Sequence, residues 1–256
     1  MPPWHSSQEY GSFTNARSLS EEDKQAIRDW VAAGAPEGDP AKLPERRDFL
    51  TGWRLPRLPD QTIAMGEKPF TVPAEDTVEY QYFVVDPGWT EDRWIRAAQV
   101  RPGNASVVHH AIVFVRPPDG AGFHGIGWLA AYVPGQRSVQ LPEGHARLVP
   151  AGSKLVFQMH YTPNGRVTED QTRVGVWELA PDEVTHEVFT RLAIDHEFEI
   201  PPREKEFAVT MSEDSFPPNG RMLGITPHMH LRGKSFELFA NGRLRKISAE
   251  NARYPV

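Results

Sequence analysis

Proline and glycine interrupt this sequence so often that few of its segments are long enough to form a helix. The chain has 24 Pro and 20 Gly among 256 residues. Proline breaks a helix from within, and glycine weakens both helices and strands. The remaining segments are short and bounded by turn residues, which is typical of β-sandwiches. We therefore expect an all-β protein of sandwich or jelly-roll type.

The N-terminal region is the exception, because one stretch has a helical pattern. Ser20 precedes three acidic residues, a typical helix start, and apolar residues between Ile27 and Val31 share one helical face. Gly34 ends the pattern. We expect a short helical arm here, followed by an extended, proline-containing linker over residues 36–59.

Farther along, apolar and polar residues alternate with the period-two pattern of half-buried strands. No helical pattern of useful length interrupts it. The region between residues 60 and 185 holds enough strands for one sandwich, whereas 191–256 is shorter than the roughly 100 residues that a two-sheet sandwich takes, so we expect its domain to be incomplete. The predicted strands cover residues 79–86, 94–100, 107–115, 154–161, 172–179, 186–200, 203–210, 222–231 and 235–240.

Charge and cysteine content exclude several classes of protein. The 34 acidic and 28 basic residues give a net charge of −6, and no basic stripe suggests a nucleic-acid partner. The chain has no cysteine, which excludes disulfides, iron–sulfur clusters, blue copper and a thiol nucleophile. No apolar run approaches the roughly 20 residues of a membrane-spanning helix. Because cysteine is absent, any metal site would have to use histidine, carboxylate or methionine ligands.

Histidine supplies the main chemical signal. His228 and His230 are two positions apart, so on a strand both side chains point to one face, with Cβ atoms about 7 Å apart. Neutral imidazole suits copper, zinc, iron and nickel, so the spacing predicts a site without naming its metal. Two exposed polar positions on a half-buried strand would give the same pattern. Five other histidines stand singly among polar or loop residues and are interpreted as surface residues: His5, His124, His145, His186 and His196.

His109 and His110 are adjacent inside an apolar strand. Successive residues of a regular strand point to opposite faces, so one imidazole would face the core, where it needs a partner. Two interpretations remain open: a core histidine bonded to the backbone, or a local bulge that lets both rings reach one ion. His160 is a third histidine in an otherwise apolar strand. Three histidines with an open position suit a redox copper or a catalytic zinc ion.

The ordered motifs VVHHAIVF, LVFQMHY and TPHMHLRG resemble those of the copper type II, ascorbate-dependent monooxygenases, which include peptidylglycine α-hydroxylating monooxygenase and dopamine β-monooxygenase. The resemblance covers about residues 78–256. It implies two consecutive jelly-roll-like β-sandwich domains, each with one copper ion. The implied organisation is an arm and linker over 1–52, a first sandwich over 53–190 and the start of a second over 191–256.

The resemblance also implies roles for the five clustered histidines. His109, His110 and His160 match the ligands of the electron-transfer copper. His228 and His230 match two of the three ligands of the oxygen-activating copper and would be the catalytic residues. The third ligand in the family is a methionine, which this sequence does not reach, so we expect the chain to be a fragment.

The activity implied by the resemblance is hydroxylation of a substrate C–H bond with dioxygen and a one-electron reductant such as ascorbate. The substrate would be a small or peptide-like molecule, and the location periplasmic or secreted. Thr226 stands where the peptidylglycine enzymes have the arginine that holds the substrate carboxylate, which disfavours peptide-glycine hydroxylation. Two alternatives stay open: a non-catalytic copper-binding β-sandwich module and a single-metal cupin-like protein.

The first residues have a resemblance of their own. MPPW and the later WVAAGAP resemble the end of a c-type cytochrome domain, with Met1 as its axial ligand. This implies haem c only if an upstream cytochrome domain exists. A start methionine and a packing helix would explain the same residues.

Overall fold

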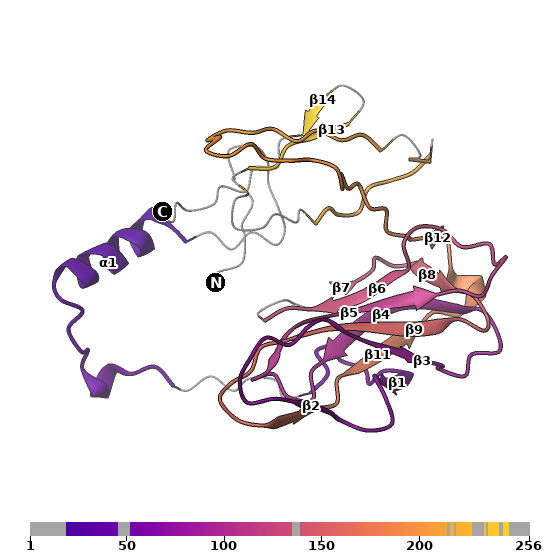
Figure 1. Ribbon diagram of the computed structural model, residues 1–256, viewed down its shortest axis with the longest axis horizontal. Helices are drawn as coiled ribbons and strands as arrows, with labels where there is room; N and C mark the ends of the chain where they lie inside the picture. Colours follow the sequence, from indigo (N-terminus) through magenta and orange to yellow (C-terminus); the bar gives the residue numbers. More distant parts are fainter. Residues whose placement is uncertain are drawn as a thin grey trace. The chain divides into compact units, whose positions relative to one another are not determined.

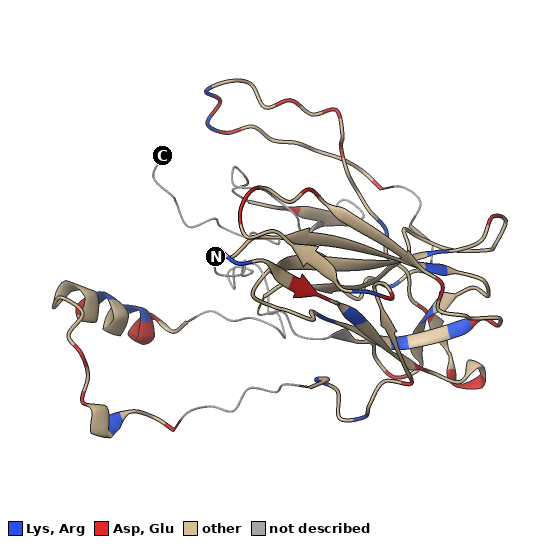
Figure 2. Ribbon diagram, turned by 60° about the horizontal axis from the view of Figure 1, so that its bottom comes forward, with Lys and Arg blue, Asp and Glu red and all other residues tan. Residues whose placement is uncertain are grey.

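The computed structural model of the protein (Figure 1) describes residues 19–45, 52–134, 139–213, 216–217, 219–226, 233, 235–240 and 243–245. The chain divides into two units, one formed by residues 48–214 and one by residues 1–47 together with 215–256. No helix within the described ranges is both long enough and apolar enough to cross a membrane. Figure 2 shows basic and acidic residues interspersed along the strands and loops of the larger unit.

The predicted N-terminal helix is confirmed. Helix α1 spans Glu21–Ala32, and the Ser20 hydroxyl accepts a hydrogen bond from the backbone N–H of Asp23 at 3.0 Å. This side-chain cap satisfies one of the free N–H groups of the first turn. A short 3₁₀ turn, η2 (Pro40–Lys42), follows in the segment expected to be extended.

The larger unit contains two sheets that share one hydrophobic core. The first sheet has the strand order β1-β11-β4-β8-β12, with β7 also paired to β4; only its β8–β12 pair is parallel. The second is antiparallel, in the order β3-β9-β5-β6. The strands of the first sheet are β1 (Gln61–Ala64), β4 (Arg93–Arg101), β7 (Val139–Gln140), β8 (His145–Val149), β11 (Arg173–Glu178) and β12 (His186–Glu187). Those of the second are β3 (Gln81–Val85), β5 (Val108–Arg116), β6 (Trp128–Tyr132) and β9 (Lys154–Tyr161).

Two small ladders complete the described structure. Strand β2 (Phe70–Val72) pairs with β10 (Thr168–Asp170), and β13 (Leu238–Ala240) pairs with β14 (Arg243–Arg245). A 3₁₀ turn, η3 (Pro181–Glu183), lies between β11 and β12. The all-β class is therefore confirmed.

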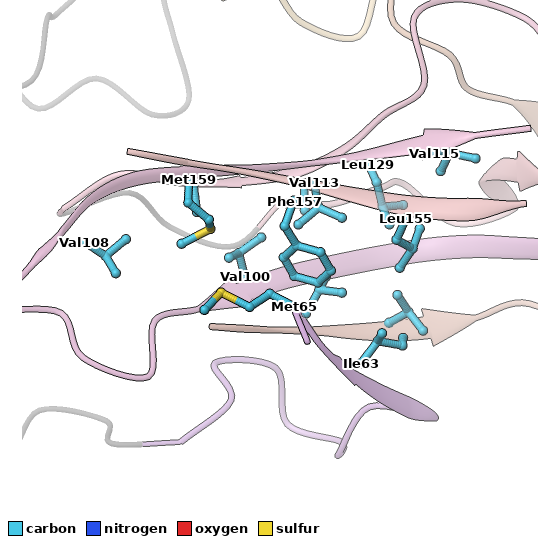
Figure 3. Close-up of a cluster of buried hydrophobic side chains, with 14 of the residues drawn as sticks. Ile63, Met65, Val100, Val108, Val113, Val115, Leu129, Leu155, Phe157 and Met159 are labelled. Atoms are coloured by element: carbon cyan, nitrogen blue, oxygen red, sulfur yellow. The ribbon is translucent and has the colours of Figure 1, made fainter. Parts of the chain in front are cut away.

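Side chains from both sheets fill the space between them. Phe157 of β9 points toward Met65 in Figure 3, and Val113 of β5 and Val176 of β11 belong to the same buried cluster. All four side chains are at most 1% exposed. The two sheets thus form a sandwich-like body, in which the apolar face of each sheet packs against that of the other.

The start of the larger unit is anchored to the first sheet, although residues 36–59 were expected to be a linker throughout. Trp53 packs edge-to-face on Trp177 with ring centroids 5.8 Å apart, and the indole N–H of Trp177 donates to the carbonyl oxygen of Arg57 at 2.8 Å. A Cβ at Gly175 would lie 2.8 Å from the Trp53 ring, so glycine is needed there for the ring to approach the strand. This segment therefore packs against β11, although its composition is typical of an extended linker.

The strand predictions were right where a neighbouring strand exists. Residues 79–86, 94–100, 107–115, 154–161 and 172–179 overlap β3, β4, β5, β9 and β11, and 235–240 contains β13. Three ranges were wrong in their described parts: 186–200 forms only the two-residue β12, and 203–210 and 222–226 form no strand. These segments alternate in polarity, but beyond β12 they form no strand ladder with another described segment, and alternation alone does not make a strand. Residues 227–231 lie outside the described part.

Candidate metal centre

A β-bulge in β5 turns His109 and His110 to the same side of the sheet. The pairing of β5 with β9 shifts register between Val108 and His110, which leaves His109 as the extra residue. Val108 and Ala111 are both buried, at 2% and 0% exposure, whereas His109 is exposed and His110 is half-buried. One extra residue lets two neighbours share a face without reversing the alternation beyond them. The predicted bulge is confirmed, and the interpretation of one ring as a core histidine is wrong.

His160 joins this pair from the adjacent strand. It lies directly opposite His110 in the β5–β9 ladder, on the face of β9 opposite its buried residues. The ligand nitrogens of His109, His110 and His160 all lie within 4.8 Å of one another. The three histidines therefore converge, as the sequence predicted, despite their separation along the chain.

The spacing of these nitrogens suits shared coordination. The Nδ1 atoms of His109 and His110 are 3.1 Å apart. Two imidazole ligands of a tetrahedral ion, each bonded at about 2.0–2.1 Å, are about 3.3 Å apart. The set as a whole is somewhat wider than the roughly 4 Å expected of ligands around one ion, so binding would draw the rings slightly together.

The surroundings of His160 favour the form that binds metals. Its Nδ1 atom is buried and has no hydrogen-bond partner among the described residues. Burial lowers the pKa of His160 below its ordinary value, and the charge of nearby His109 lowers it further. A neutral imidazole can donate a lone pair to a metal, whereas a protonated one cannot. The buried Nδ1 atom of His160 is therefore available to a metal ion.

Tyr80 covers one side of the histidine triad. Its ring stacks on His160 with centroids 4.9 Å apart and an interplanar angle of 30°. Its hydroxyl oxygen lies 3.4 Å from Nε2 of His110. Tyr80 was not among the predicted site residues, although Tyr80 and Tyr82 stand two apart at the start of a predicted strand and so share a face. The position of Tyr80 beside the triad depends on the pairing of β3 with β9, which the sequence alone does not indicate.

A buried carboxylate ties together the two strands that carry the triad. Asp170, 1% exposed, accepts hydrogen bonds from the hydroxyls of Tyr161 (3.0 Å) and Thr172 (2.8 Å) and from the backbone N–H of Asn104 (2.8 Å). Tyr161 follows His160, and the carbonyl of Asn104 accepts from the first N–H groups leading into β5. Burial raises the pKa of Tyr161, and the negative charge of Asp170 raises it further. This network positions both strands from inside the sandwich.

Among the described residues, the triad is the one cluster of three or more histidines or carboxylates whose ligand atoms come this close. It offers three nitrogen donors and, through exposed His109, an open side. Comparisons of the chain with protein-family models, with curated proteins and with solved structures found no match. The function is therefore inferred from the geometry of the site and from the sequence motifs. His228 and His230, predicted for a second metal ion, lie outside the described residues.

Proposed function

We propose that this protein is a copper-dependent monooxygenase of the ascorbate-dependent, type II kind, in which His109, His110 and His160 hold the electron-transfer copper. The observation that carries the proposal is the bulge in β5. It interrupts a regular ladder in order to place two adjacent imidazoles beside a third. Imidazole-only coordination with no thiolate suits copper among several late transition metals, and the ordered histidine motifs favour copper over the others.

The proposed reaction inserts one oxygen atom of dioxygen into a substrate C–H bond. The second oxygen atom leaves as water, which requires two electrons and two protons. A one-electron reductant such as ascorbate supplies the electrons singly. Copper bound at the triad would supply the one-electron redox step, alternating between its cuprous and cupric forms.

The chain's own residues would hold and shield this centre. The three imidazoles would provide the donors, and burial, which lowers the pKa of His160, favours its neutral form. Tyr80 covers one face of the His160 ring, while the Asp170 network links the strands on which the ligands lie. Exposed His109 leaves a side open to the reductant.

The rest of the proposal follows the family resemblance. His228 and His230 would be two ligands of the oxygen-activating copper and would act as the catalytic residues. They would lie in a second jelly-roll-like domain that begins near residue 191, after a first domain over 53–190. The substrate would be a small or peptide-like molecule, and the location periplasmic or secreted.

The test is copper loading followed by anaerobic reduction. We expect the wild-type chain to bind copper that ascorbate reduces, seen as loss of the cupric electron paramagnetic resonance signal. His160→Ala should lose most of this reducible copper. His196→Ala, which removes an exposed histidine with no part in the triad, should not. Copper that remains cupric in excess ascorbate, or that is unaffected by His160→Ala, would contradict the assignment.

A second candidate is a copper-binding module without oxygenase activity. The observation in its favour is that all three triad ligands come from two neighbouring strands of the larger unit, so the centre needs no residue from elsewhere. Ascorbate-reducible copper without ascorbate-dependent oxygen consumption would favour this candidate. One metal ion per chain, held by His228 and His230 alone, would instead favour the cupin-like alternative.

A further inference from the structure

The hydroxyl of Tyr80 lies beside one of the two ring nitrogens of His110, and His109 lies beside the other. Tyr80 immediately precedes β3, which pairs with β9. This pairing places the Tyr80 ring on His160, with centroids 4.9 Å apart, and its hydroxyl oxygen 3.4 Å from Nε2 of His110. Tyr80 therefore contacts two of the three residues of the triad at once.

The neighbours of the two nitrogens indicate which one His110 presents to an ion. Nδ1 of His110 lies 3.1 Å from Nδ1 of His109, whereas its Nε2 lies next to the Tyr80 oxygen. The two nitrogens of an imidazole ring point in different directions, so one ion can be bound by only one of them. Because Nδ1 is the nitrogen that lies beside a second ligand residue, a shared ion would be bound through Nδ1.

The planes of the three rings allow their nitrogens to converge. The plane of His110 is tilted by 67° from that of His109 and by 78° from that of His160. The lone pair of a ring nitrogen lies in the plane of its ring, so parallel stacked rings would direct their lone pairs along separate lines. Rings whose planes cross, as these do, can direct their lone pairs to one point.

Binding of an ion through Nδ1 determines where the proton of His110 lies. A neutral imidazole carries one proton, so Nε2 must carry it when Nδ1 is bonded to a metal. This N–H can then donate a hydrogen bond to the hydroxyl oxygen of Tyr80, which has lone pairs to accept it. Metal-binding histidines commonly donate their second N–H to a fixed acceptor, which orients the ring and makes it a stronger ligand.

We propose that Tyr80 is a positioning residue, whose hydroxyl accepts a hydrogen bond from Nε2–H of His110 and so directs Nδ1 of that ring toward the ion of the triad. The inference rests on the proposed function, because it requires that the triad binds a metal ion. Stacking on His160 limits the movement of the Tyr80 ring and so holds its hydroxyl beside His110. One side chain thus orients one ligand residue and covers another.

The experiment compares Tyr80→Phe with Tyr82→Phe in the full chain with His228 and His230 changed to Ala, so that the second predicted metal site is removed. Tyr80→Phe keeps the ring and removes only the hydroxyl. Tyr82→Phe is the matched control, since it removes a hydroxyl that Gln158 bonds on the same face of the sheet. Affinity for cuprous ion is measured anaerobically by competition with a coloured chelator. Tyr80→Phe should weaken binding by about 10-fold, and Tyr82→Phe should leave it unchanged.

Imidazole ¹⁵N NMR gives a second readout, which a purely structural role of Tyr80 would not change. With Tyr80 present, the cuprous chain should have copper on Nδ1 of His110 and a proton on Nε2. In Tyr80→Phe that proton should exchange faster with water, because its acceptor is gone. Copper on Nε2 of His110, or equal affinity with and without the Tyr80 hydroxyl, would overturn this proposal and leave the triad as a copper site. A chain that retains Tyr80 but binds no cuprous ion would overturn it together with the proposed function.

Discussion

The buried carboxylate of Asp170 should contribute more to stability than any other single polar group near the triad. Asp170→Ala removes the acceptor for three donors, from Tyr161, Thr172 and Asn104. Hydrogen bonds to charged groups contribute about 1.5–3 kcal/mol each, and leaving buried donors unpaired adds a further cost. The carboxylate's own burial offsets part of this sum. We therefore expect Asp170→Ala to lower the free energy of unfolding by about 3–5 kcal/mol.

Two related substitutions separate the contributions of the individual hydrogen bonds to this loss of stability. Asp170→Asn keeps an oxygen for the N–H of Asn104, and its amide can donate to the two hydroxyls, so it should cost only about 1–2 kcal/mol. Tyr161→Phe removes one donor and should also cost about 1–2 kcal/mol. Glu169→Ala, an exposed neighbour in β10, is the matched control and should change stability by less than about 0.5 kcal/mol.

The assay is equilibrium unfolding in urea, with the fitted slope compared among variants to verify that the same surface is exposed on unfolding. An Asp170→Ala variant no less stable than Glu169→Ala would refute the reasoning. An Asp170→Asn variant as unstable as Asp170→Ala would refute the hydrogen-bond explanation and favour charge alone.

The remaining predictions concern metal binding and protonation. Copper titration should show a tight site removed by His160→Ala and a weaker one removed by His230→Ala, because the triad offers three imidazoles and the pair His228 and His230 offers two; two sites of equal affinity would contradict this. In the metal-free protein, Tyr80→Ala should raise the pKa of His160 toward its ordinary value, since burial is the main cause of its lowering; an unchanged NMR titration would show that Tyr80 does not bury the ring. The hydrogen bond from Arg57 lowers the pKa of Asp60. The ionised Asp60 carboxylate therefore stabilises the fold above the ordinary carboxyl pKa, and this contribution is lost as pH falls through the lowered pKa. Asp60→Asn should therefore be less stable than wild type at neutral pH and equally stable in strong acid, as measured by urea unfolding at both.

Much of the sandwich could be predicted because its central strands carry their pattern locally. The predicted strand over 154–161 coincides with β9, in which buried and outward residues alternate without a break. The short strand β8 was missed, since its alternation is blurred by Arg147, which is directed toward the core side opposite Ile95. An arginine in this position makes a half-buried strand look like a loop.

The candidate site was predictable to a similar degree. Two neighbouring histidines in an apolar strand predict either one core-facing histidine or a local bulge, and both outcomes could be predicted from the sequence. Choosing between them required the register of β5 against β9, a relation between positions 50 residues apart. The contacts of Tyr80 and of His145 with His186 depend on strand pairing in the same way, so no local pattern could indicate them.

The bulge makes the triad depend on the number of residues in β5 as well as on their identity. With His109 absent and the strand regular, Val108 and Ala111 would keep their places in the core, and His110 would still face His160. The sandwich would retain every buried side chain, but the third ligand would be gone. Insertion of a single histidine codon into such a strand would therefore convert a two-ligand surface into a three-ligand centre, without replacing any residue of the core.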